Sequence, residues 1–264
     1  VDNTAPTGDL TFGSTGPYKQ GDFVGIFATF SEDIADTPTP KITITPQSGS
    51  SGLTAQTFTM SKMSAQNYSL DYTVPSGDGD CKITFTQGTD LAGNAITLLP
   101  TQNDTFTIDN TPPEMSISAK NSSGTDVTSG SSTSDATLTL TFNTGESTSD
   151  FAQDDINPVN GTLSNFSGSG TSYTATFTPN DDGNDKSCTI SVDAGKYTDA
   201  AGNSNIGGSF SWTFLVPPFM TITATEPGIP APFNIIDSAE PVFAPDLSLQ
   251  FVSNKSTADF TKSD

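Results

Sequence analysis

The sequence predicts an all-β protein built from tandem antiparallel β-sandwiches, two complete and one incomplete. Apolar and polar residues alternate over short segments, and Gly, Pro and Asn clusters separate these segments. No stretch shows the 3.6-residue period of an amphipathic helix, and Thr, Gly and Pro are frequent throughout. The motif TDLAGN at Thr89 returns as TDAAGN at Thr198, which indicates a long internal repeat.

The repeat divides the chain at short Pro-containing hinges. An Asp-Asn-Thr-Pro-Pro segment begins at Asp109, the first residues read VDNTAP, and a Pro-Pro pair stands at Pro217. We therefore expect three units, residues 1–110, 111–216 and 217–264, with the third incomplete because its pattern breaks off part-way through the repeat. The chain begins in hinge-like sequence, so we interpret it as a segment of a longer protein.

In the first unit we expect strands wherever apolar residues recur at every second position. The clearest is Asp22–Phe30, whose inward set is Val24, Ile26, Ala28 and Phe30. The other expected strands contain Leu10 and Phe12, Ile42 and Ile44, Tyr68 to Tyr72, Cys81 to Phe85, and Phe106 with Ile108.

The second unit shows the same pattern more clearly, with seven period-2 segments separated by turn signals. We expect Trp212 and Phe214 to lie in its core, packed against Leu140, Tyr173 and Cys188 across the sandwich. The expected strands are 115–119, 136–143, 156–159, 161–166, 171–179, 186–194 and 209–215. The outward rows of threonine on two of them could bind ice or carry O-glycans, but threonine is also simply a good strand residue.

Cys81 and Cys188 occupy the same position in successive units, within DGDCKITF and DKSCTISV. Equivalent positions in tandem sandwiches lie tens of ångströms apart, whereas a disulfide needs Cα atoms within about 7 Å. We expect two buried free thiols, and a disulfide to another chain remains the alternative.

The third unit is expected to expose an apolar face on strands Phe219–Ala224 and Asp246–Val252. Met220, Ile222, Leu247, Leu249 and Phe251 would form that face, and two strands with such a face are not stable alone. Either the chain continues beyond Asp264 or a neighbouring molecule donates strands, with the Pro-rich segment Glu226–Pro245 as a docking arm.

Composition excludes several classes of function. The chain has 30 acidic residues against nine lysines and carries a net charge of −21. This charge argues against nucleic acid and anionic membrane partners, and it favours divalent cations. No apolar run is long enough for membrane insertion. There is no histidine, and the acidic pairs in loops have no partner motif, so we expect no enzyme activity.

Several segments resemble the bacterial Ig-like repeats of giant surface adhesins, which also occur in extracellular proteins of algae and other microbial eukaryotes. The resemblance is carried by DNTAPT, FSEDI, DINPVNGTLSNFSGSGTSYTATFTP, TISVDAGKYTDAAGNSN and the WTF strand. It implies immunoglobulin-like sandwiches in the stalk or fibre body of an extracellular, cell-surface protein, with neighbouring copies as partners. The alternative is a module that recognises glycans or a partner protein through its loops.

The acidic hinges are the best candidates for a site. We predict that Asp90, Asn94, Asp109 and Asn110 form a calcium site at the joint of the first two units, because calcium takes about 6–8 oxygen ligands. Some adhesins of the resembling family stiffen hinges in this way. The alternative is that DxxGN is only a turn, in which Asp accepts backbone N–H groups.

Six Asn-x-Ser/Thr sequons occur, a number close to that expected by chance in so Ser- and Thr-rich a chain. The exposed ones would be glycosylation candidates in a eukaryotic source. They begin at Asn67, Asn103, Asn121, Asn160, Asn165 and Asn254.

Overall fold

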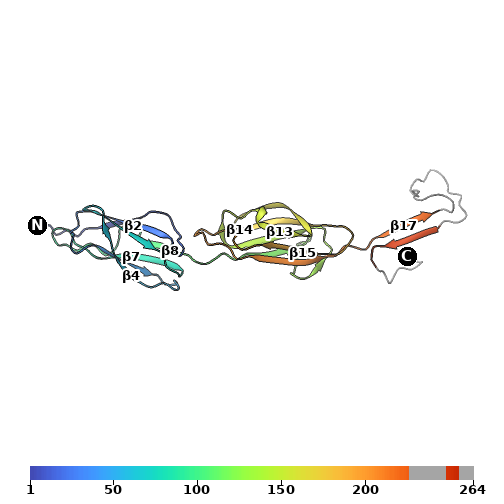
Figure 1. The fold of residues 1–264 in the computed structure, drawn as a ribbon, viewed down its shortest axis with the longest axis horizontal. Coiled ribbons are helices and arrows are strands. Elements are labelled where there is room, and N and C mark those ends of the chain that lie inside the picture. Colours follow the sequence, from blue (N-terminus) through green and yellow to red (C-terminus); the bar gives the residue numbers. More distant parts are fainter. Residues whose placement is uncertain (226–247, 256–264) are drawn as a thin grey trace.

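A computed structural model describes residues 1–225 and 248–255 of the chain. Two β-sandwiches and a two-stranded hairpin follow one another end to end, so the molecule is elongated (Figure 1). Apart from one 3-10 turn, Gln153–Asp155, the regular elements of these residues are all strands, as the period-2 pattern predicted.

The first sandwich consists of two four-stranded antiparallel sheets. One has the order β1 (Gly8–Phe12), β2 (Phe23–Phe30), β6 (Asn67–Thr73), β5 (Ser61–Lys62). The other has the order β4 (Gln56–Thr59), β3 (Lys41–Pro46), β7 (Gly79–Gln87), β8 (Thr105–Ile108).

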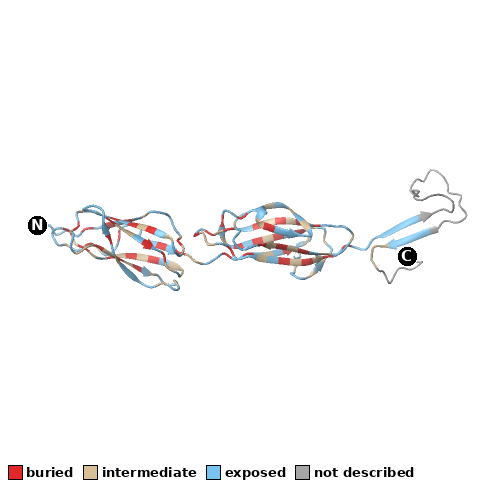
Figure 2. Ribbon diagram, viewed as in Figure 1, coloured by how far each residue is buried: buried red, intermediate tan, exposed pale blue. Residues whose placement is uncertain are grey.

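Alternation along the strands builds the core between these sheets. Strand β2 shows it best, because Val24, Ile26, Ala28 and Phe30 are all buried while the residues between them face outwards. The inner faces of the two sheets meet in one contiguous apolar cluster (Figure 2). The predicted core face of this unit is confirmed.

The second sandwich repeats this architecture. One sheet has the order β10 (Asp126–Val127), β9 (Ser116–Lys120), β12 (Leu138–Thr148), β14 (Gly161–Pro179). The other has the order β11 (Ser132–Thr133), β16 (Gly208–Phe214), β15 (Lys186–Val192), β13 (Ile156–Val159). Strands β9, β12, β15 and β16 correspond to β1, β2, β7 and β8 of the first sandwich, and β11 pairs with β16 in parallel.

Strand β14 contains the two segments predicted as separate strands, and it folds back on itself between Gly168 and Gly170. Both glycines have positive φ, and the Ser172 carbonyl oxygen and Tyr173 Cα lie closer to the Cβ position of Gly168 than a real side chain would allow. The arm before the turn runs antiparallel beside the arm after it, and Asn165 donates to Thr176 at 3.3 Å.

The threonine rows pair with each other across β12 and β14, with Thr139 opposite Thr176 and Thr141 opposite Thr174. Such cross-strand threonine pairs are an ordinary way to stabilise a sheet. The geometry therefore favours the simpler interpretation of these rows, as strand-forming residues.

Trp212 and Phe214 lie in the core of the second sandwich, as predicted, with 2% and 5% of their surface exposed. The contacts of Trp212 differ in part from the prediction. Its ring packs edge-to-face on Phe177, with centroids 4.7 Å apart, whereas the ring of Tyr173 packs against Phe151. Cys188 is the register neighbour of Trp212 within the same sheet, so it does not face Trp212 across the sandwich.

Both cysteines are buried and free. They occupy equivalent strands, β7 and β15, where each alternates with inward apolar residues as expected. Desolvation by burial raises the pKa of both thiols, which keeps them protonated and unreactive at neutral pH.

The third unit is described only as a hairpin of β17 (Met220–Thr225) and β18 (Ser248–Ser253). Its apolar side chains are exposed, with Ile222 at 56% and Leu249 at 48%, and it contrasts with the two buried cores in Figure 2. Part of the predicted third unit lies outside the described residues. This part includes Leu247 of the apolar face, Asp246 at the start of the second expected strand, and the expected docking arm Glu226–Pro245.

Candidate metal centre

Two clusters of three carboxylates stand at equivalent places in the two sandwiches. The first cluster is Asp2, Glu32 and Asp90, and the second cluster is Asp109, Glu146 and Asp199. Within each cluster, one oxygen from each carboxylate lies within 4.8 Å of the others. Each cluster draws one residue from the hinge, one from the C-terminal end of β2 or of its counterpart β12, and one from the DxxGN turn.

The DxxGN turn fixes the most buried carboxylate of each cluster. Asp90 is 2% exposed and accepts backbone N–H bonds from Ala92 at 2.9 Å and Asn94 at 2.8 Å. Desolvation acts to raise its pKa, but hydrogen bonds from Asn94, Ala92 and Gly93 outweigh that effect and lower the pKa below its ordinary value. This carboxylate therefore stays ionised.

Asp199 occupies the same position in the second sandwich and accepts bonds from the backbone and side-chain nitrogens of Asn203, both at 2.9 Å. Gly202, like Gly93 in the first turn, has a positive φ that suits glycine. In both DxxGN motifs the aspartate therefore accepts backbone N–H bonds, as expected for a simple turn. Each turn also contributes its aspartate carboxylate to a cluster.

The asparagine of each turn also ties the hinge to the sandwich that follows it. Asn203 donates its side-chain amide to the carbonyl oxygen of Asp109 at 2.9 Å, and Asn94 donates to the carbonyl oxygen of Asp2 at 3.2 Å. These bonds hold the hinge carboxylate beside the turn carboxylate.

Glu32 and Glu146 are the third carboxylates of the two clusters, and acidic groups surround both of them. Burial, followed by repulsion from Asp109, Asp199 and Asp78, raises the pKa of Glu146. Among the described residues, Glu146 has neither a hydrogen-bond donor nor a lysine partner for its carboxylate. Burial and then repulsion from Asp2 and Asp90 raise the pKa of Glu32 in the same way.

The second cluster lies at the joint between the sandwiches, which we define as residues 109–113 and call the first joint. Asp78 reaches it from the first sandwich and accepts the backbone N–H of Asn110 at 2.6 Å. Lys19, also from the first sandwich, donates to the carbonyl oxygen of Gly202 at 2.8 Å. Its ammonium therefore bonds a backbone oxygen of the second sandwich and leaves the carboxylates uncompensated.

The four residues predicted to form one site do not come together. Asp90 and Asn94 belong to the first cluster, whereas Asp109 belongs to the second and Asn110 lies beside it, bonded to Asp78. The physical reason is strand β7, which runs from Asp78 to the segment before Asp90. Its nine residues span about 30 Å and place the two clusters at opposite ends of the first sandwich.

The prediction missed Asp2, Glu32, Glu146 and Asp199. A signal for them exists in the sequence, because FSED and FNTGES each begin at the last inward phenylalanine of an alternating segment, Phe30 and Phe142. Aligning the two repeats would have placed a glutamate, a hinge aspartate and a turn aspartate at matching positions in both.

The donor set fits a hard divalent cation such as calcium. Each cluster offers only carboxylate oxygens, with backbone carbonyl groups close by, and contains no nitrogen or sulfur ligand. In the second cluster both oxygens of Glu146 are available. Aspartates and the glutamate would hold the ion there, with water completing the 6–8 ligands that calcium takes.

The raised pKa of Glu146 predicts a pH dependence in calcium-free protein. The folded state binds the proton more tightly than the unfolded chain, so this contribution to stability is full below the ordinary pKa of 4.5 and is lost as pH rises through the raised value. Glu146→Gln should therefore melt at a higher temperature than wild type at pH 7. The difference should shrink towards zero near pH 4, and a pH-independent difference in melting temperature would contradict the electrostatic explanation.

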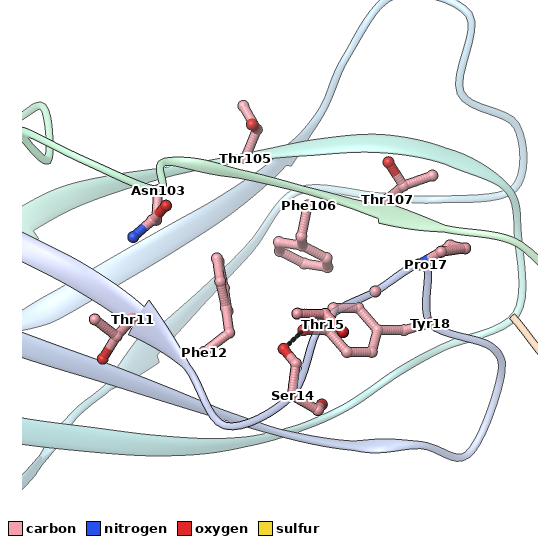
Figure 3. Close-up of a pocket in the computed structure, with 11 residues that line it drawn as sticks. Thr11, Phe12, Ser14, Thr15, Pro17, Tyr18, Asn103, Thr105, Phe106 and Thr107 are labelled. Carbon is pink, nitrogen blue, oxygen red and sulfur yellow. Dashed lines mark hydrogen bonds between the residues drawn. The ribbon is translucent and has the colours of Figure 1, made fainter. Parts of the chain in front are cut away.

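A groove of about 620 Å³ opens on the first sandwich between β1 and β8 (Figure 3). Its floor is formed by Phe12, Tyr18 and Phe106, whose rings pack edge-to-face at 5.9 and 6.0 Å. Tyr18 and Phe106 are largely buried by these contacts, and the Tyr18 hydroxyl donates to the Ser14 carbonyl oxygen. In the second sandwich β11 covers the corresponding edge of β16.

Three of the six sequon asparagines occupy turns that need a positive φ. Asn103, Asn160 and Asn165 have φ values of 55°, 60° and 54°, a region that asparagine tolerates better than most residues. Their side-chain amides donate to oxygens of the same sandwich. Local turn geometry is therefore enough to explain these three asparagines.

Comparison with known proteins decides the type of the second sandwich. Residues 109–216 match the family model described as the bacterial Ig-like domain. The second sandwich is a bacterial Ig-like domain. This confirms the resemblance for that part of the chain, and the first sandwich has corresponding sheets and a corresponding cluster. None of the curated proteins compared with the chain matches it.

Bacterial Ig-like domains are generally non-catalytic and typically occur in surface proteins, as extracellular modules of a structural or adhesive kind. In the described part of the chain, no helix has the length and apolar character needed to cross a membrane.

Proposed function

We propose that this chain is a non-catalytic, extracellular spacer: a stalk or fibre segment of a large cell-surface protein. The observation that carries the proposal is the way the repeats join. Successive sandwiches lie end to end (Figure 1), Lys19 of the first sandwich bonds to Gly202 of the second, and Asn203 bonds to Asp109 within the first joint. A segment built this way transmits position and force along its length, and neighbouring copies in a fibre or surface layer are its natural partners.

We further propose that calcium binds the second cluster and stiffens the first joint. The support is electrostatic, because Asp109, Glu146 and Asp199 share one small volume with Asp78 nearby, in a chain of net charge −21. The hinge supplies Asp109 and the second sandwich supplies the other two carboxylates. A bound cation would therefore tie the hinge to the domain that follows it. The first cluster would act in the same way on the residues that precede the first sandwich.

Ligand recognition is the second candidate, and the groove between β1 and β8 is the feature that favours it. Hydroxyl and aromatic groups line it, a combination suited to a glycan or an extended peptide. It ranks second because its rings are packed against one another and present little flat surface. The exposed sequon asparagines, such as Asn67, are the positions where N-linked glycans would be attached in a eukaryotic host.

Imaging the native full-length protein by electron microscopy tests the spacer proposal. We expect a thread or fibre with regularly spaced beads, each of the size of one sandwich. A compact particle in which the repeats pack side by side would contradict it, because the joints would then not be holding successive domains in line.

A further inference from the structure

The joint between the second sandwich and the hairpin, residues 215–219, differs in its charges from the first joint. We call it the second joint. Asp185 corresponds to Asp78, since each stands three residues before the buried cysteine of its repeat. Asp185 accepts the backbone N–H of Val216 at 2.8 Å, just as Asp78 accepts that of Asn110 at 2.6 Å. One element of the joint is therefore retained.

The two other charged positions are changed. Asp109 has Leu215 as its counterpart, because each follows the last core residue of its final strand. Glu146 has Lys255 as its counterpart, because FNTGES and FVSNKS align with the phenylalanine four residues before each. At the second joint a carboxylate is thus lost and another is replaced by an ammonium group.

Lys255 uses that ammonium group to bridge the second and third units. Its Nζ atom lies 2.7 Å from Oδ1 of Asp185, the same oxygen that accepts the Val216 N–H. Hydrogen bonding from Lys255 and from the Val216 backbone lowers the pKa of Asp185, so the ion pair is fully charged at neutral pH. Asn254, next to Lys255, accepts the Phe219 N–H at 2.7 Å and holds the start of β17 beside it.

We infer that the residue at position 146 and its counterpart Lys255 determine where each joint obtains its positive charge. The first joint has glutamate there and depends on an external divalent cation, whereas the second has lysine and carries its own cation. The second joint is therefore fixed in the absence of calcium. The half of this inference that concerns the first joint rests on the proposed calcium site, and the half that concerns Lys255 does not.

Spin-label distance measurements on the 264-residue chain test this inference at both joints. Labels at Thr59→Cys and Thr139→Cys report on the first joint, and labels at Thr139→Cys and Thr221→Cys report on the second. These positions are exposed, whereas Cys81 and Cys188 are buried and escape labelling. In wild type, calcium should narrow the distance distribution across the first joint and leave that across the second unchanged.

Two charge exchanges provide the decisive comparison. Glu146→Lys should narrow the first-joint distribution in chelator and abolish its response to calcium, because the new ammonium group would face Asp78 as Lys255 faces Asp185. Lys255→Glu should broaden the second-joint distribution at low ionic strength. Asp126→Lys and Lys120→Glu make the same charge changes at the Lys120–Asp126 ion pair of the second sandwich, which includes no residue of either joint, and should change neither distribution.

The failures are distinguishable. No response of the wild-type first joint to calcium would overturn the proposed calcium site and the first half of the inference with it. A calcium response that survives in Glu146→Lys would overturn only the first half. A second-joint distribution that is unchanged in Lys255→Glu would overturn the assignment of Lys255, whatever the first joint does.

Discussion

Replacing Trp212 with alanine is expected to lower the free energy of unfolding of the second sandwich by about 3–5 kcal/mol. The indole is 2% exposed and packs edge-to-face on Phe177, so truncation leaves a large cavity that both sheets must close. A loss of this size is a large part of the stability of one domain. Calorimetry of the wild type and the variant measures it as a lower melting temperature for the second sandwich.

Two further variants separate core packing from other effects. Phe106→Ala removes the equivalent residue of the first sandwich and should destabilise that sandwich instead. Trp212→Phe should cost less than alanine. It keeps most of the ring, and it also removes a buried indole N–H that has no hydrogen-bond partner among the described residues. An unchanged melting transition of the second sandwich in Trp212→Ala would show that the inner face of β16 has been misassigned.

Calcium is expected to raise the stability of the second sandwich through the second cluster. A ligand that binds only the folded state at 100 times its dissociation constant contributes about 2.7 kcal/mol, and relief of the repulsion at Glu146 is part of that binding free energy. Trp212 is the only tryptophan of the chain, so its fluorescence follows the melting of this sandwich specifically. The measurement is a melting curve with calcium and with chelator, at equal ionic strength.

Asp109→Asn and Glu146→Gln provide the controls, because each removes one ligand charge from the cluster without a change of size. Both should lose most of the calcium effect, while Glu32→Gln should leave it intact since Glu32 belongs to the first cluster. Equal stabilisation of all these variants would mean that calcium acts only by screening the net charge.

The strands could be predicted from the sequence wherever one face is buried. Val24 to Phe30 and Leu138 to Phe142 alternate strictly, and the structure buries the expected set in both cases. The path of β14 is less apparent, because Gly168 and Gly170 indicate a turn without showing that the two arms belong to one folded-back strand. Local pattern determines which face is buried, whereas pairing depends on contacts distant in the sequence.

The sequence allowed the type of candidate site, a group of hinge and turn carboxylates, to be predicted. It did not allow the residues of each cluster to be predicted. One turn aspartate, Asp90, and one hinge aspartate, Asp109, were predicted because each lies in a motif that recurs, whereas their counterparts Asp199 and Asp2 were missed. Asp90 and Asp109 were grouped together because they are near in sequence. The strand through Phe106 and Ile108, β8, was predicted between them, but its consequence was not drawn: the chain runs along the sandwich between the turn at Asp90 and the hinge at Asp109, so the two aspartates belong to different clusters. Glu146 was missed because its signal appears only when the two repeats are aligned, which places it opposite Glu32.

Small-angle scattering of the 264-residue chain in calcium tests the end-to-end arrangement most directly. The account predicts a pair-distance distribution skewed to long distances, with the cross-section of a single sandwich, because the joints hold the domains in line (Figure 1). Chelator should broaden the long-distance part, since the first joint loses its cation. A compact, symmetrical distribution in calcium, from sandwiches packed side by side, would contradict the account.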